Sequence, residues 1–266
     1  MKSTPSNSKD IVVKNLYFSN WGDNLGYPLA FAVLPYVAKI PGVTPNLVTI
    51  FSFLLYITGC LLLFINIPHH LSIAGIFIIL GFVGDDLDGQ LARYKKMHSD
   101  IGSFLDLTLD ILKIFIISLS LGYAVYLQSQ QIIHLVLGFA SCFFFFFRYY
   151  IKLETMFAQI VKDEKYLEKF LSKRAELISH MNNGILKPTT SITQNVRKLL
   201  FKHKLIFVLD EAEFAILIGI FAFLNRLDIA LYLFAFGQFV WAIYRWIERG
   251  YQIHTNSPRL LWPMRK

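Results

Sequence analysis

The chain is poor in cysteine and in charge. Its 266 residues include only two cysteines, Cys60 and Cys142, and both lie within apolar runs. This arrangement provides neither a disulfide framework nor the paired spacing of a zinc site, so both cysteines are expected to pack as small hydrophobic residues. Charged residues make up 17% of the chain and hydrophobic residues 55%, and the mean hydropathy is +0.49. This balance excludes an ordinary soluble protein and predicts an integral membrane protein.

The amino terminus lacks a recognisable secretory signal. Residues 1–24 contain no apolar stretch followed by a small-residue cleavage site, so membrane insertion is expected to depend on later segments. Lysine and arginine outnumber aspartate and glutamate by 26 to 18, which gives a net charge of +8. In a soluble protein this excess would suggest nucleic acid as a partner. In a membrane protein it indicates basic cytoplasmic loops and attraction to anionic lipid, and no nucleic acid is expected to bind.

Six apolar segments have the length and composition of transmembrane helices. They cover residues 47–67, 71–92, 101–127, 132–150, 207–224 and 229–247. An earlier segment, residues 25–40, is only sixteen residues long and contains Pro28 and Pro35. It is expected to lie along the headgroups as an amphipathic interfacial helix, and a kinked first span is the alternative. The predicted fold is an all-α integral membrane protein with six transmembrane helices and this N-terminal interfacial helix.

Basic residues predict the orientation. Apart from Lys113 and Arg148, which lie inside spans, every lysine and arginine except Arg226 falls in the termini, in the turn after the second span or in residues 152–204. These parts are therefore expected to be cytoplasmic, in a bacterial inner membrane, with the site facing the cytoplasm.

The same pattern divides the chain into three parts. Residues 1–44 form a cytoplasmic segment with the interfacial helix, 45–251 form the six-span domain with a cytoplasmic insertion at 152–204, and 252–266 form a cytoplasmic tail. The insertion is expected to lie on the membrane surface, and gating of substrate access is the alternative.

Four aspartates interrupt the apolar pattern of the second and third spans. Asp85 and Asp88 stand at i and i+3 near the end of one span, and Asp106 and Asp110 stand at i and i+4 near the start of the next. Helical periodicity puts each pair on one face, and the short basic turn between the spans lets the two pairs face each other. An ionised aspartate near the bilayer centre costs about 2.5–3.5 kcal/mol. One or two divalent cations held by these carboxylates would offset that cost.

The spacing around these aspartates resembles the signature of the CDP-alcohol phosphotransferase family. The pattern D-x-x-D-G-x-x-A-R, eight further residues, and G-x-x-x-D-x-x-x-D is filled without a missing position by Asp85, Asp88, Gly89, Ala92, Arg93, Gly102, Asp106 and Asp110. It fixes eight positions over 26 residues, which makes it far more specific than a short motif. The resemblance implies transfer of a substituted phosphate group from a CDP-alcohol to a hydroxyl acceptor, with release of CMP.

The resemblance also implies a role for each residue. Asp85, Asp88 and Asp106 would be ligands of Mg²⁺ or Mn²⁺, with two ions expected, and Asp110 would be both a shared ligand and the general base. Arg93 would bind a donor phosphate, and its alternative is an anchor at the membrane surface. The other substrate-binding candidates are two residues of a P-N-x-x-T pattern, a loop serine and three small residues that leave room for the nucleotide: Asn46, Thr49, Ser99, Gly89, Ala92 and Gly102.

Charged residues outside the motif leave alternatives open. Asp210, Glu211 and Glu213 precede or open the fifth span and either point into the same cavity or are exposed carboxylates at a helix N-terminus. Arg148 and Lys152 at the end of the fourth span either bind an acceptor phosphate or extend toward the membrane surface.

The sequence thus predicts a membrane enzyme of phospholipid biosynthesis that uses CDP-diacylglycerol and a hydroxyl acceptor, in contact with membrane lipid. Transfer of a small CDP-linked headgroup is an alternative, and a cation transporter with an acidic intramembrane site is the alternative from another class. The cation transporter has no need of Gly89, Ala92 and Arg93 at their motif positions. The resemblance also allows a homodimer.

Overall fold

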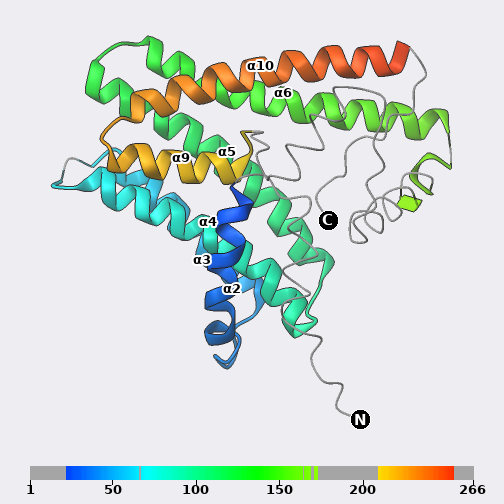
Figure 1. Ribbon diagram of the computed structural model, residues 1–266, viewed down its shortest axis with the longest axis horizontal. Coiled ribbons are helices and arrows are strands. Elements are labelled where there is room, and N and C mark those ends of the chain that lie inside the picture. The colour runs from blue at the N-terminus through cyan, green and yellow to red at the C-terminus, as the bar shows by residue number, and fades with distance from the viewer. Residues whose placement is uncertain (1–21, 66, 164, 169–170, 173–208, 255–266) are drawn as a thin grey trace, which may run out of the picture.

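The computed structural model describes residues 22–65, 67–163, 165–168, 171–172 and 209–254, and the regular secondary structure of these residues is entirely helical. The all-α prediction is therefore confirmed for this part of the chain. The helices, shown in Figure 1, are α2 (Asp23–Val37), α3 (Pro45–Leu62), α4 (His70–Lys95), α5 (Asp100–Ser129), α6 (Ile133–Lys162), α9 (Glu211–Phe223) and α10 (Leu227–His254).

Local sequence signals explain where the helices around the motif begin. Thr44 caps α3, because its hydroxyl accepts a hydrogen bond from the Leu47 amide at 3.3 Å, and Pro45 occupies the first turn. Ser99 caps α5 in the same way, through the Gly102 amide at 3.0 Å. Both caps fix the entry of the chain into a helix that carries residues of the candidate site.

Within the described residues, four helices are long and apolar enough to cross a membrane: Pro45–Leu62, His70–Lys95, Ile133–Lys162 and Leu227–Tyr251. The structure thus supports a membrane protein, while the count of six spans is not confirmed. The helix α5 carries Asp106, Asp110 and Lys113 in its first half. The helix α9 has 13 residues and is about 20 Å long, shorter than the roughly 30 Å hydrocarbon core of a bilayer.

Several helices differ in extent from the sequence prediction: α3 ends at Leu62 instead of residue 67, and α10 continues to His254. The helix α6 continues to Lys162, so the first residues of the predicted insertion 152–204 extend this helix. Most of the remaining insertion, residues 173–204, lies outside the described residues, as do residues 1–21 of the predicted N-terminal segment and the tail from residue 255. The segment predicted as an interfacial helix forms α2, and no membrane defines its depth.

The helix α4 lies at the centre of the fold and packs against α2, α3 and α9, while α5 packs against α3 and α6. The long helices α6 and α10 run side by side along one edge of the molecule (Figure 1). Small residues allow the closest approaches. A Cβ atom added at Gly81 of α4 would come within 2.9 Å of the α3 backbone, and one at Gly122 of α5 within 2.9 Å of the Gly138 Cα of α6.

The main hydrophobic core joins α3, α4, α5, α9 and α10 through side chains that are almost fully buried, including Tyr56, Ile78, Ile117, Phe214 and Phe234. A smaller cluster joins Ala30 and Leu34 of α2 to Leu87 and Leu91 of α4. The main core takes Leu71 to Phe82 of α4, and the smaller cluster takes Leu87 and Leu91 in its last turns, so α4 is packed along its length.

Candidate functional site

The candidate site is built by the last turns of α4 and the first turns of α5. The helix α4 ends at Lys95, and Lys96 adopts a left-handed conformation with φ of 56° that turns the chain toward α5. Only the four residues from Lys96 to Ser99 therefore separate the two helices that carry the motif. As the sequence predicts, the two pairs of aspartates come to face each other.

The carboxylates form two groups. Asp85, Asp88 and Asp106 offer oxygen atoms that all lie within 4.8 Å of one another, and the same holds for Asp85, Asp110 and Glu211. Asp85 belongs to both groups. All four predicted ligands are thus brought together, and carboxylate oxygens at this spacing are the donors that Mg²⁺ and Mn²⁺ prefer. The donor set fits a divalent cation.

Glu211 enters the site from α9, and its neighbours have other roles. The carboxylate of Asp210 accepts a hydrogen bond from the Arg148 guanidinium at 2.7 Å, and the Glu213 carboxylate accepts one from the Asp210 amide at 2.9 Å. The sequence did not decide whether these three acidic residues enter the site or are exposed at the start of a helix. The structure separates them, because only Glu211 joins an acidic group.

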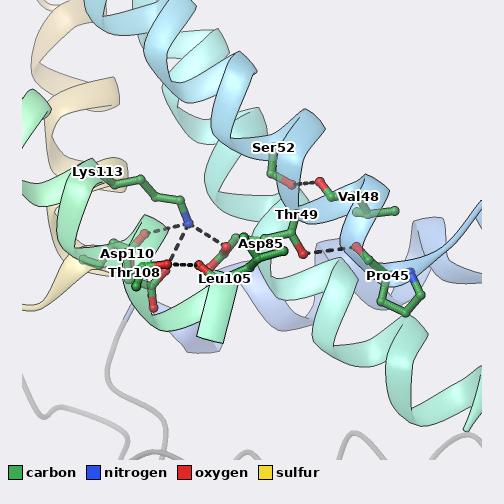
Figure 2. A network of polar contacts seen from close by, with 10 residues as sticks. Pro45, Val48, Thr49, Ser52, Asp85, Leu105, Thr108, Asp110 and Lys113 are labelled. Atoms are coloured by element: carbon green, nitrogen blue, oxygen red, sulfur yellow. Dashed lines mark hydrogen bonds and ion pairs between the residues drawn. The ribbon is translucent and has the colours of Figure 1, made fainter. Parts of the chain in front are cut away.

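Lys113 is the site residue that sequence reasoning missed. Its side chain is fully buried, and its ammonium lies 2.5 Å from Asp85 Oδ1, 3.1 Å from Asp110 Oδ1 and 3.1 Å from Glu211 Oε1. Figure 2 shows the lysine reaching from α5 to Asp85 and Asp110. A signal was present, since Lys113 stands three residues after Asp110 on the same helix face, and a lysine inside an apolar helix requires a partner.

Three predicted substrate-binding residues meet at the start of α5. A Cβ atom added at Gly102 would lie 2.9 Å from Asn46 Oδ1 and 3.0 Å from Ser99 Oγ. The glycine therefore leaves a space lined by two polar side chains, as close approach of a ligand would require. Ser99 uses its hydroxyl to cap α5, which its sequence position alone did not indicate.

The remaining candidates have mixed surroundings. Thr49 is buried, and its hydroxyl donates to the Pro45 carbonyl oxygen at 3.1 Å, which is the packing role that its sequence pattern left open (Figure 2). Gly89, Ala92 and Arg93 are half-buried on the last turns of α4. Arg93 Nε is buried without a hydrogen-bond partner among the described residues. An unused donor on the last turns of α4 suits an anionic ligand.

Arg148, expected either to bind an acceptor phosphate or to extend toward the membrane surface, makes contacts within the protein. It is buried, it bonds to Asp210, and its guanidinium lies 5.2 Å from the centre of the Phe145 ring. This contact ties α6 to the residue before Glu211. Lys152 lies over the ring of Tyr149, at 5.4 Å from its centre.

Comparisons with known proteins agree with the motif. The sequence model of CDP-alcohol phosphatidyltransferase matches residues 42–178. An uncharacterized protein of Aquifex aeolicus (strain VF5) is 37% identical over 68 residues, which are 26% of this chain and 33% of the relative. The bifunctional IPC transferase and DIPP synthase of Thermococcus kodakarensis (strain ATCC BAA-918 / JCM 12380 / KOD1) is 38% identical over 68 residues, which are 26% of this chain and 15% of the relative. The matched stretch thus spans a third or less of each curated relative.

Proposed function

This chain belongs to the CDP-alcohol phosphatidyltransferase family, and from that premise we propose that it transfers a phosphatidyl group from CDP-diacylglycerol to a hydroxyl acceptor. The family transfers a phosphate group from a CDP-alcohol to an acceptor, in phospholipid biosynthesis. In the proposed reaction a bond forms between the acceptor oxygen and the phosphorus of the phosphatidyl group. The bond from that phosphorus to the CMP oxygen breaks, and CMP leaves.

The observation that supports a lipid donor is an exposed apolar stripe on α5, the helix that also carries Asp106 and Asp110. Ile101, Phe104 and Leu107 recur along one face of α5 among the motif residues, and each is more than 60% exposed. Because exposed apolar side chains of a membrane-spanning helix contact lipid, the acyl chains of a lipid donor can lie against this helix.

The charged residues divide the chemistry among them. Asp85, Asp88 and Asp106 would hold Mg²⁺ or Mn²⁺, and a bound ion would neutralise the diphosphate and stabilise the departing CMP. Arg93 donates hydrogen bonds to a donor phosphate, and Asn46, Ser99 and Gly102 line the space for the nucleotide. Asp110 takes the proton of the acceptor hydroxyl, because it lies at the edge of the acidic site and remains partly exposed.

A donor screen tests this proposal. Purified protein in detergent is incubated with Mg²⁺, with CDP-diacylglycerol or a small CDP-alcohol as donor, and with glycerol phosphate, inositol phosphate, serine or diacylglycerol as acceptor. We expect CMP release to depend on CDP-diacylglycerol and on one soluble acceptor. Release from only a small CDP-alcohol with diacylglycerol would instead assign transfer of the headgroup and would contradict the lipid donor.

We also propose that α3, α4, α5, α6, α9 and α10 together form the membrane domain and that the site opens toward the cytoplasm. The turn beside the site contains Lys95 and Lys96, while the turn between α9 and α10 contains Arg226 paired with Asp228 at 2.9 Å. Basic residues favour the cytoplasmic side, so these two turns would lie on opposite sides of the membrane.

Cysteine labelling tests this orientation. Cys60 and Cys142 are buried, so a new exposed cysteine is expected to give most of the signal. In intact bacterial cells, an impermeant maleimide should label the Arg226→Cys variant and leave Lys96→Cys unlabelled until the cells are opened. Labelling of Lys96→Cys in intact cells would reverse the proposed orientation.

A further inference from the structure

Lys113 places a permanent positive charge inside one of the two acidic groups. A lysine ammonium has three N–H donors, and Lys113 has three carboxylates around it, one each from α4, α5 and α9. The side chain is fully buried, so its positive charge is stabilised by these carboxylates and not by water. The three carboxylates therefore form a cation site that the Lys113 ammonium occupies.

The ammonium is unequally shared between the two acidic groups. Lys113 contacts every member of the group Asp85, Asp110 and Glu211, but only Asp85 in the group Asp85, Asp88 and Asp106. A divalent cation within the first group would have to lie beside the ammonium and would be repelled by it. A divalent cation within the second group would be separated from the ammonium by the shared carboxylate of Asp85.

Glu211 also contacts Lys113, although it lies outside the segment that matches the family model. It lies on α9, beyond residues 42–178, and it is buried with its carboxylate 3.1 Å from the lysine. The contact of Arg148 with Asp210 holds the start of α9 in place. Lys113 and Glu211 thus form a pair that the chain adds to the four motif aspartates.

We propose that Lys113 is a positioning residue that acts as a built-in cation and occupies one of two cation positions in the acidic site. In the absence of donor, the enzyme then holds one divalent ion, between Asp85, Asp88 and Asp106. The ammonium keeps Asp85, Asp110 and Glu211 together, and a second divalent ion binds only when Lys113 is displaced. This inference rests on the proposed function, because it assumes that the motif aspartates bind a divalent cation.

Mn²⁺ binding to donor-free protein tests the inference. Purified parent protein and variants are titrated with Mn²⁺, and the unbound ion is measured by electron paramagnetic resonance. The parent is expected to bind about one Mn²⁺ per chain, and Lys113→Met about two, because the vacated carboxylates form a second site. Glu211→Gln, which keeps the ammonium, is the matched control and is expected to bind about one.

Two further variants keep the test decisive if Lys113→Met folds poorly. Lys113→Arg retains the positive charge and should bind one ion. Lys113→Met combined with Glu211→Gln removes one charge of each sign, and should bind two. The melting temperature of Lys113→Met should also rise more on addition of Mn²⁺ than that of the parent, because the ion replaces the lost cation.

Each outcome has a distinct meaning. Two Mn²⁺ ions bound by the donor-free parent, or one bound by the folded variants that lack the lysine, would overturn the role of Lys113 while leaving the proposed reaction intact. A parent that binds no Mn²⁺ would contradict the metal site on which the proposed function depends. CMP release, measured separately, reports on the reaction alone.

Discussion

Asp85→Asn is expected to lower CMP release by about 10³-fold, because Asp85 is the one carboxylate shared by both acidic groups. Asparagine keeps the size of the side chain and one oxygen, but it removes the negative charge that a divalent ion and Lys113 both use. The Lys113 ammonium lies 2.5 Å from the Asp85 carboxylate, so the substitution would also free one side of the lysine. Steady-state CMP release at saturating Mg²⁺ measures the loss.

Asp86→Asn is the matched control for this substitution. Asp86 is the next residue on α4, yet it belongs to neither acidic group, and its carboxylate lies on the side that approaches Gly26 of α2. The same chemical change at this position should leave CMP release within a few-fold of the parent. Equal losses in the two variants would mean that general damage to α4, and not the acidic site, explains the effect.

Asp110→Asn is expected to lower turnover by about 10²–10⁴-fold while leaving donor binding close to that of the parent. The substitution removes the proton acceptor, but the three carboxylates of Asp85, Asp88 and Asp106 remain to hold the ion. The Lys113 ammonium, 3.1 Å from Asp110 Oδ1, keeps two of its three partners. We therefore predict that Asp110→Asn loses turnover but keeps its affinity for the donor.

Asp88→Asn supplies the contrast that distinguishes a base from a ligand. Asp88 belongs only to the group proposed to bind the divalent ion. Its substitution should weaken metal binding, so that raising the Mg²⁺ concentration restores part of the activity. If Mg²⁺ restores Asp110→Asn to the same extent, Asp110 acts chiefly as a ligand, and the proton goes to another group.

The part of the site that could be predicted is the part encoded by local periodicity. Asp85 and Asp88 on α4, and Asp106 and Asp110 on α5, lie at helical spacings, so their faces follow from the sequence alone. The short turn between the helices then brings the two faces together.

The parts that could not be predicted depend on contacts between distant segments. Lys113 appeared to be a charge within a span, and only the packing of α9 against α4 and α5 brings Glu211 to it. The sequence did not separate Glu211 from Asp210 and Glu213, because the partners of the latter two are a guanidinium on α6 and a helix-start amide. The sequence predicted six spans, and the described residues contain four helices long and apolar enough to cross a membrane.

CMP release by the purified parent protein, with and without a divalent ion, tests the acidic site most directly. With CDP-diacylglycerol and its acceptor present, chelation of divalent ions should reduce CMP release to the rate without enzyme, and Mg²⁺ or Mn²⁺ should restore it. A cation transporter with the same aspartates would release no CMP under either condition. Full CMP release in metal-free buffer would contradict the assignment of Asp85, Asp88 and Asp106 as metal ligands.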